Sequence, residues 1–121
     1  MGNSKVNITE KFTKISDLWN PKVIAEMNNY QFKLAKVKGE FIWHSHKETD
    51  EAFIIIEGKL SIELRSKVIN LSKGEMYVVP KGVEHKPYAE RECQIMLVEP
   101  KGVVNTGEFH TNQTAPNDQW L

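Results

Sequence analysis

The sequence predicts an all-β protein, folded as a sandwich or a barrel, and two observations carry this prediction. Between residues 21 and 98, short apolar-rich runs follow one another at regular intervals, separated by Gly, Asn, Pro or charged residues typical of turns. Several of these runs alternate apolar and polar side chains with a period of two, as a strand with one buried face does. Helix signals occur only near Ser16. Short strands without intervening helices are typical of antiparallel sandwiches and barrels.

The 121 residues are predicted to form one domain, with a barrel core at about residues 21–100. This length can bury a core without disulfide or metal support. Residues 1–20 form an N-terminal arm, in which Ser16 and Asp17 predict a single capped helical turn that ends before Pro21. Residues 101–121 are a polar tail, whose final Trp-Leu pair is expected to pack on the body of the protein or on a second subunit.

The expected strands follow from the alternation and from the turn residues between them. They lie at residues 23–27, 30–34, 41–46, 52–56, 60–64, 68–71, 76–79 and 93–98. In the second of these, Gln31 and Lys33 alternate with larger apolar residues, which predicts a half-buried strand. The fourth is apolar on both faces, as in a strand buried inside a barrel.

Composition excludes some classes of function. Lysine plus arginine and aspartate plus glutamate are equal in number, at 16 each, so the chain lacks the basic excess of a nonspecific nucleic-acid-binding protein. The N-terminus has no apolar signal region and no apolar run is long enough to cross a bilayer, which predicts a cytoplasmic protein without a membrane partner. Cys93, the only cysteine, lies in an apolar run and is expected to be a buried core residue.

Three histidines and one glutamate are the most informative residues for function. His44 and His46 are two residues apart on an expected strand, so their side chains project from the same face. Glu51 can return toward that face across a short polar loop, and His85 comes later, after the strand that Pro80 ends. Imidazole and carboxylate are good ligands for divalent transition metals. We therefore predict a metal site formed by these four side chains.

The same residues lie in two sequence motifs. The first starts at His44 and reads His-x-His-x4-Glu-x6-Gly, and the second ends at His85 and reads Gly-x5-Pro-x-Gly-x2-His. Both resemble the conserved motifs of the cupin superfamily, whose small members include the mannose-6-phosphate isomerase-like cupins. The resemblance implies a double-stranded β-helix, the RmlC-like jelly-roll barrel. Two positions depart from the usual pattern: Gly39 precedes the first histidine by five residues rather than six, and Ala89 replaces a frequent asparagine.

The resemblance implies that His44, His46, Glu51 and His85 hold a divalent metal ion. Three neutral imidazoles and one carboxylate leave this ion a net charge near +1 and, in an octahedral geometry, two open positions. Such a site suits an anionic or chelating small molecule, or water with dioxygen. The ligand set does not distinguish among Mn, Fe, Co, Ni, Cu and Zn.

Several functions remain open for such a site. The first is a metal-dependent enzyme acting on a small metabolite, since similar cupins include dioxygenases, decarboxylases, isomerases and lyases. The second is a non-catalytic sensory or storage protein that binds a small molecule. A sugar-phosphate isomerase-like activity is a third, although the sequence offers no convincing phosphate-binding segment. A fourth is an interaction protein that uses the barrel only as a scaffold and binds no metal.

Strand alternation also predicts which side chains surround the site. Ile42, Phe53, Ile55 and Tyr88 are expected to line the pocket, whereas Phe41 and Trp43 should point away from it. Lys86, Tyr88 and Arg91 lie near His85 in sequence, and they either contact a substrate carboxylate or form a solvated rim. Asp50 is either a loop carboxylate or a group that orients an imidazole. His110 lies outside both motifs and is expected at the surface.

An exposed edge strand promotes aggregation, and association with a second subunit removes such an edge. Cupins commonly pair through their edge strands, so the resemblance implies a homodimer. The residues before Pro21 are a candidate for a strand that covers an edge or is exchanged between subunits.

Overall fold

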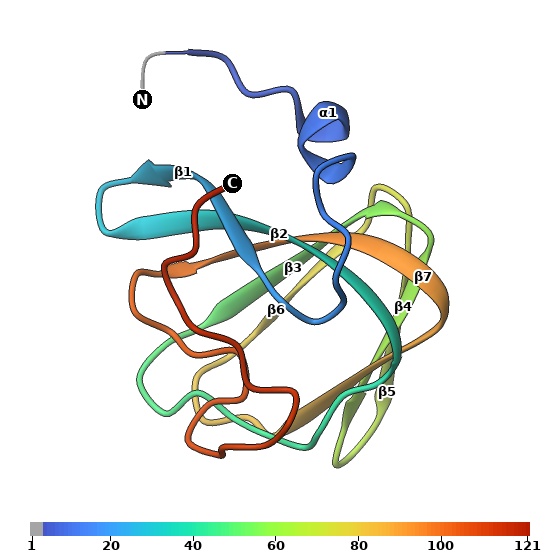
Figure 1. The fold of residues 1–121 in the computed structure, drawn as a ribbon. Coiled ribbons are helices and arrows are strands. Elements are labelled where there is room, and N and C mark those ends of the chain that lie inside the picture. Colours follow the sequence, from blue (N-terminus) through green and yellow to red (C-terminus); the bar gives the residue numbers. More distant parts are fainter. Residues whose placement is uncertain (1–3) are drawn as a thin grey trace.

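The computed structural model describes residues 4–121 and shows an antiparallel β fold with one short helix (Figure 1). The elements in chain order are α1 (Ile8–Phe12), β1 (Lys22–Met27), β2 (Tyr30–Glu40), β3 (Glu51–Glu57), β4 (Lys59–Leu64), β5 (Val68–Ser72), β6 (Met76–Val79) and β7 (His85–Pro100). The predicted all-β class is confirmed. Among the described residues, no helix has the length and apolar character needed to cross a membrane.

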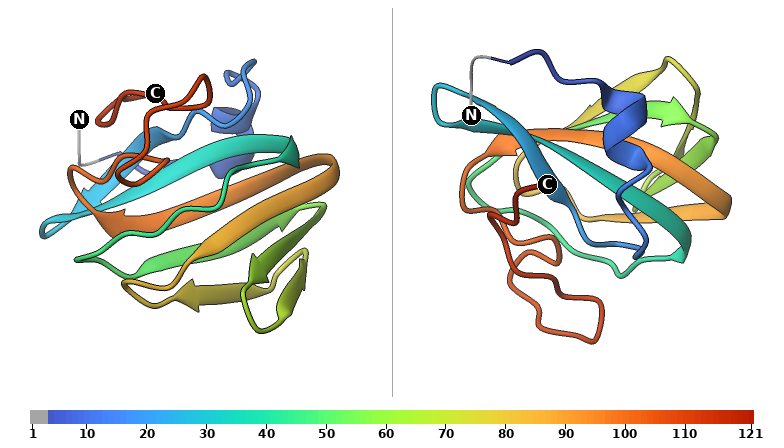
Figure 2. Two further views of the ribbon diagram at one scale, coloured as in Figure 1. Left: turned by 90° about the horizontal axis from the view of Figure 1, so that it is seen from below. Right: turned by 45° about the horizontal axis from the view of Figure 1, so that its top comes forward.

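The long strand β7 organises the sheet. It pairs with β2 along one edge, and along the other edge it pairs with β4 through its first residues and with β3 through its later ones. The sheet order is β1-β2-β7-β3-β6, and the β4–β5 hairpin joins it through β7 (Figure 2). The sequence predicted only the second half of β7, because its first half is largely charged and its pairing with β4 is not a local signal.

The inner faces of the strands enclose an apolar core. The buried members of this core are Ala35, Val37, Phe53, Ile55, Leu60, Ile62, Leu71, Val79, Ala89, Cys93, Ile95 and Leu97. Cys93 is fully buried as predicted, and burial raises the pKa of its thiol to about 11. Its sulfur is therefore a packing atom rather than a nucleophile at neutral pH.

Strand β2 differs from the half-buried strand that the sequence predicted. Gln31 and Lys33 are 0% and 3% exposed, and by alternation they share the inner face with Ala35 of the core. Leu34, on the opposite face, is also fully buried. The prediction of one solvated face was wrong because other segments cover both sides of this strand.

The N-terminal arm supplies part of that cover. Its helix α1 packs Phe12 against Leu34 and Met96 on the outer face of the sheet, where the views in Figures 1 and 2 place it. The helical turn predicted just before Pro21 was misplaced, because that segment is irregular, with bends at Asp17 and Trp19, and its Leu18 forms an isolated parallel bridge with β2. The helix signal that the prediction missed is Asn7, whose side-chain oxygen accepts a hydrogen bond from the Glu10 amide at 3.0 Å.

The C-terminal tail lies against strand β1. The amide of Val23 in β1 donates to the carbonyl of Gln119, and the amide of Leu121 donates to the carbonyl of Val23. Leu121 also packs against the apolar cluster that contains Phe12. The terminal residues thus pack on their own subunit, and this contact occupies part of the open edge of β1.

The segment that carries the first two histidines is also different from the prediction. Residues 41–46 were expected to form a strand, but β2 continues to Glu40 and residues 41–46 are irregular apart from one bridge between His44 and His85. A register shift in β2 between Val37 and Gly39 redirects the chain there. Side-chain alternation therefore does not apply through this segment.

Candidate metal centre

The four predicted ligands come from three separate segments. His44 and His46 lie on the irregular segment after β2, Glu51 is the first residue of β3, and His85 is the first residue of β7. His44 and His85 exchange two backbone hydrogen bonds, of 3.0 Å and 2.9 Å, and this bridge places their imidazole centroids 4.2 Å apart. The backbone therefore fixes the position of these two side chains before any ligand is bound.

Two further contacts attach the loop between His46 and Glu51 to the body of the protein. The Gly82 amide donates to the carbonyl of His46 at 2.8 Å, and the Lys81 amide donates to the Asp50 carboxylate at 2.8 Å. Asp50 was interpreted as either a loop carboxylate or a group that orients an imidazole, and here it ties the loop to the turn after β6. The turn that precedes His85 thus also holds the segment that carries His46.

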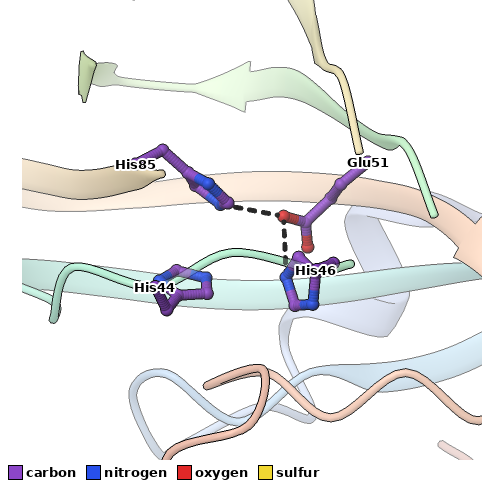
Figure 3. A group of neighbouring side chains, drawn as sticks. All are labelled: His44, His46, Glu51 and His85. Atoms are coloured by element: carbon purple, nitrogen blue, oxygen red, sulfur yellow. Dashed lines mark hydrogen bonds and ion pairs between the residues drawn. The ribbon is translucent and has the colours of Figure 1, made fainter. Parts of the chain in front are cut away.

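The four side chains point toward one another (Figure 3). Each is buried, and their donor atoms all lie within 4.8 Å of one another. Oε1 of Glu51 is 3.3 Å from Nε2 of His85 and 3.4 Å from Nε2 of His46. All four residues singled out in the sequence are therefore brought together in one cluster.

Backbone carbonyl groups select the tautomer of two of the imidazoles. Nδ1 of His44 is 2.9 Å from the carbonyl oxygen of Ile42, and Nδ1 of His85 is 3.0 Å from that of Val83. A carbonyl oxygen only accepts, so each Nδ1 carries the proton and donates it. The Nε2 lone pair of each ring is then free to bind an ion, in the manner typical of metal-ligating histidines.

The electrostatics of the cluster favour the protonation states that a metal requires. Burial, assisted by repulsion from His85, lowers the pKa of His44 to about 4, so this imidazole is neutral at neutral pH. Burial alone would raise the pKa of Glu51, but the adjacent imidazoles of His46 and His85 outweigh burial and hold that pKa well below its usual range. Glu51 is therefore a carboxylate.

The donor set fits a divalent transition metal. Nε2 of His46 is buried and has no hydrogen-bond partner within the described part of the chain, which is costly for a polar atom unless something else satisfies it. Three imidazole nitrogens and one carboxylate oxygen match the preferences of such ions. These four residues could hold a divalent metal ion.

A buried ion pair beside the cluster was missed by the sequence analysis. Nζ of Lys33 is 2.7 Å from Oε2 of Glu99, and both side chains are almost completely buried. Burial raises the pKa of Glu99, the neighbouring carboxylate of Glu51 raises it further, and Lys33 opposes both. The available signal was two opposite charges, one in each of two apolar strands, but local patterns do not reveal that β2 and β7 are neighbours.

An apolar cavity adjoins His44 and Glu51. Of the side chains expected around the site, Phe53 lines this cavity, whereas Ile42, Ile55 and Tyr88 do not. Phe41 lines it, contrary to the prediction, because the irregular segment does not alternate. Trp19 of the N-terminal arm and Asn105 of the tail complete the wall, and no local sequence signal placed them there.

The remaining charged candidates lie away from the cavity. Lys86 donates to Glu40 at 2.9 Å, and Arg91 borders a separate surface cleft. Trp43 packs beneath the guanidinium of Arg65, at 3.8 Å from the ring centroid. None of these side chains reaches the cavity beside the metal centre.

Comparisons with known proteins agree with this fold and site. Residues 32–99 match the cupin domain. A cupin-2 domain containing protein from Shewanella frigidimarina NCIMB 400 is 58% identical, with a TM-score of 0.78 over 79% of this chain and 94% of that chain. Protein NMB1881 from Neisseria meningitidis is 31% identical, with a TM-score of 0.74 over 80% of this chain and 99% of that chain.

Curated relatives add no activity. The uncharacterized protein YdbB of Bacillus subtilis is 38% identical over 64 residues, which are 52% of this chain and 57% of that protein. The chain spans about half the length of the curated relatives it matches. The matched cupin domain covers more than half of the chain and contains all four residues of the cluster. The chain therefore belongs to the cupin family and has its jelly-roll fold.

Proposed function

We propose that this protein is a metal-dependent cupin that binds a small chelating molecule at a divalent ion held by His44, His46, Glu51 and His85. The observation that carries the proposal is the convergence of their four buried donor atoms within 4.8 Å. The carbonyl groups of Ile42 and Val83 fix two of the imidazole tautomers, so the nitrogens that face the centre are free to bind.

The charges of the cluster favour a particular kind of ligand atom. Three neutral imidazoles and the Glu51 carboxylate would leave a divalent ion with a net charge near +1, which attracts an anionic oxygen donor. When bound, the ion supplies Lewis acidity that polarises a carbonyl or enolate oxygen. The residues of this chain hold the donor geometry and exclude water through the apolar wall beside His44.

A non-catalytic binding protein is the second candidate, and one observation favours it. His44 and Glu51 are the only titratable side chains that line the cavity within the described residues. Both belong to the proposed ligand set, so no separate general acid or base lies at hand. A sugar-phosphate isomerase-like activity is less well supported, because neither lysine nor arginine lines this cavity.

Elemental analysis tests the metal centre. Protein purified without chelator or nickel resin should contain close to one divalent ion per chain, and His46→Ala should reduce that content severely because it removes a ligand. His110→Ala is the matched control, since His110 is an exposed histidine outside the cluster. A wild-type protein that binds no divalent metal, even after loading, would refute the site.

A second measurement separates an enzyme from a binding protein. The reconstituted protein should be incubated with metabolite pools, and both product formation and oxygen consumption should be followed. Turnover that is lost in His46→Ala supports the enzyme. A molecule that stays bound and unchanged supports the sensory or storage role.

We also propose a homodimer formed through the β6 edge of the sheet. Within residues 4–121, β6 pairs only with β3, and its outward side chains Met76 and Val78 are 55% and 44% exposed. By register they continue the apolar rows of β3 and β7 that include Ile54 and Met96. Light scattering at micromolar concentration should give the dimer mass, and Val78→Lys should give the monomer. A monomeric wild-type protein would contradict the proposal.

A further inference from the structure

We propose that the ligand of this centre is a compact molecule that is apolar, and preferably flat, apart from the one or two oxygen atoms that bind the metal. Phosphorylated sugars, and molecules with a second charged group remote from the metal, are excluded from this class. The inference rests on the proposed metal centre and specifies its ligand. It follows from the wall of the cavity, from the partners of every polar group there, and from the aromatic side chains.

The wall of the cavity offers carbon atoms almost everywhere. Apart from the proposed ligands His44 and Glu51, Asn105 is the only one of the described residues lining it that has a polar, non-aromatic side chain. The Asn105 amide donates to the carbonyls of Trp19 and Gln113 at 3.0 Å and 2.9 Å, and its oxygen accepts the Ala115 amide at 2.9 Å. Both the nitrogen and the oxygen of the Asn105 side chain are therefore already hydrogen-bonded within the protein. A polar group placed against this wall would lose water without gaining a partner.

Cationic side chains near the cavity are committed elsewhere. Lys33 is paired with Glu99 behind the wall, and Lys86 is paired with Glu40 at the surface. Neither side chain lines the cavity. A phosphate or a second carboxylate on the ligand would therefore meet no positive charge except that of the metal.

Aromatic rings shape the remaining space. Trp19 stacks on Phe41 with ring centroids 4.7 Å apart and an interplanar angle of 22°, and Phe41 meets the His44 imidazole edge-on. The indole is held in place because Nε1 of Trp19 donates to the carbonyl of Lys38 at 2.9 Å. Fixed, flat faces of this kind suit a planar apolar group at low entropic cost.

The size of the cavity limits the ligand. The space open to the centres of water molecules is about 30 Å³, compared with roughly 10–15 Å³ for a single water. A bulky or heavily hydroxylated molecule would have to displace the Trp19 and Phe41 rings. A compact ligand can instead place its donor atoms on the metal and extend its apolar part along these rings into the wider hollow, whose empty volume of about 350 Å³ includes open solvent.

Matched hydroxamic acids test the inference on the full-length protein loaded with cobalt(II). Acetohydroxamic, benzohydroxamic and 4-carboxybenzohydroxamic acid share one metal-binding group and differ only in the remainder. The cobalt absorption spectrum reports coordination, and titration gives affinity. Benzohydroxamic acid should bind at least tenfold more tightly than acetohydroxamic acid, and the added carboxylate should weaken binding at least tenfold. Mannose 6-phosphate should not perturb the spectrum.

Variants locate the effect in the cavity. Trp19→Ala and Phe41→Ala should reduce the preference for the benzo compound to less than threefold while metal content stays unchanged. Phe109→Ala is the control, because this exposed aromatic residue lies outside the cavity. Equal affinity for the first two acids in wild type, or tighter binding of the carboxylated acid or the sugar phosphate, overturns the inference. Metal content is measured first, so failure of the metal centre itself is distinguished from failure of the ligand class.

Discussion

The buried ion pair between Lys33 and Glu99 gives a quantitative test of how the interior next to the metal centre is stabilised. At 2.7 Å and an effective dielectric constant near 20, the attraction between the two charges is about 6 kcal/mol. Removing both ions from water costs several kcal/mol each, so the intact pair contributes little net stability. Removal of one partner should instead leave an uncompensated buried charge, which typically costs about 3–5 kcal/mol.

The two single substitutions should not be equivalent. Burial and Glu51 already raise the pKa of Glu99, so in Lys33→Met this carboxyl group can take up a proton and become neutral. We expect that variant to lose only about 1–3 kcal/mol, the cost of a poorly satisfied buried polar group. Glu99→Leu leaves Lys33 with only the carbonyl of Val103, at 3.5 Å, and should lose about 3–5 kcal/mol. The double variant should lie within about 1 kcal/mol of wild type.

The sign of the pH dependence adds a second check. Lys33 opposes the rise in the pKa of Glu99, so Lys33→Met should raise that pKa further, and the stability of this variant should fall more steeply than that of wild type as pH rises above the ordinary carboxyl pKa. Urea unfolding followed by tryptophan fluorescence, with a chelator present, measures each free energy. Equal costs for the two single variants, or a double variant as unstable as their sum, would refute this account.

Three further predictions follow from other parts of the molecule. In the metal-free protein, the depressed pKa of His44 should make the folded state lose about 3 kcal/mol of stability as pH falls from 6.5 toward 4, because the unfolded state takes up a proton first. Urea unfolding midpoints measured against pH, with His44→Gln as the reference, test this. Gly58→Ala should destabilise the protein by about 2–4 kcal/mol in thermal unfolding, because φ is +94° and the new Cβ would lie 3.2 Å from Cα of Cys93. Gly82→Ala, where φ is +80° but the space around the glycine is open, should cost only about 1–2 kcal/mol. Asp50→Ala should weaken metal affinity about tenfold in a competition titration by releasing the loop from the Lys81 amide, while Glu48→Ala should not.

Local sequence signals identified the four residues of the cluster, whereas their convergence depends on the long-range bridge between His44 and His85. The spacing of His44 and His46, the glutamate at the start of β3 and the framed turn before His85 are each readable within a few residues. Most strand positions follow from alternation for the same reason, since one buried face imposes a period of two. The strands in the structure lie where the alternation predicts them except where the chain departs from regular strand geometry, as at residues 41–46.

Long-range pairing explains what the sequence did not predict. Lys33 has the pattern of a solvent-facing residue until β7 is placed beside β2, which brings Glu99 to it. The helix α1 depends on Asn7 for its cap and on the outer face of the sheet for its packing, and only the cap is a local feature. A period-two pattern indicates that one face of a strand is buried, but it does not indicate whether a neighbouring segment also buries the opposite face.

The metal centre lies wholly inside the matched domain, whereas part of the cavity wall comes from segments outside it. All four residues of the cluster lie inside the matched cupin domain, residues 32–99. Trp19 and Asn105, which close the apolar cavity, lie outside it in the N-terminal arm and the C-terminal tail. Asn105 binds the Trp19 carbonyl directly, so the two segments form a single wall over the shared centre. The apolar wall beside the metal centre therefore depends on the N-terminal arm and the C-terminal tail as well as on the matched domain, so a change at Trp19 or Asn105 can alter the ligand cavity without touching a proposed metal ligand.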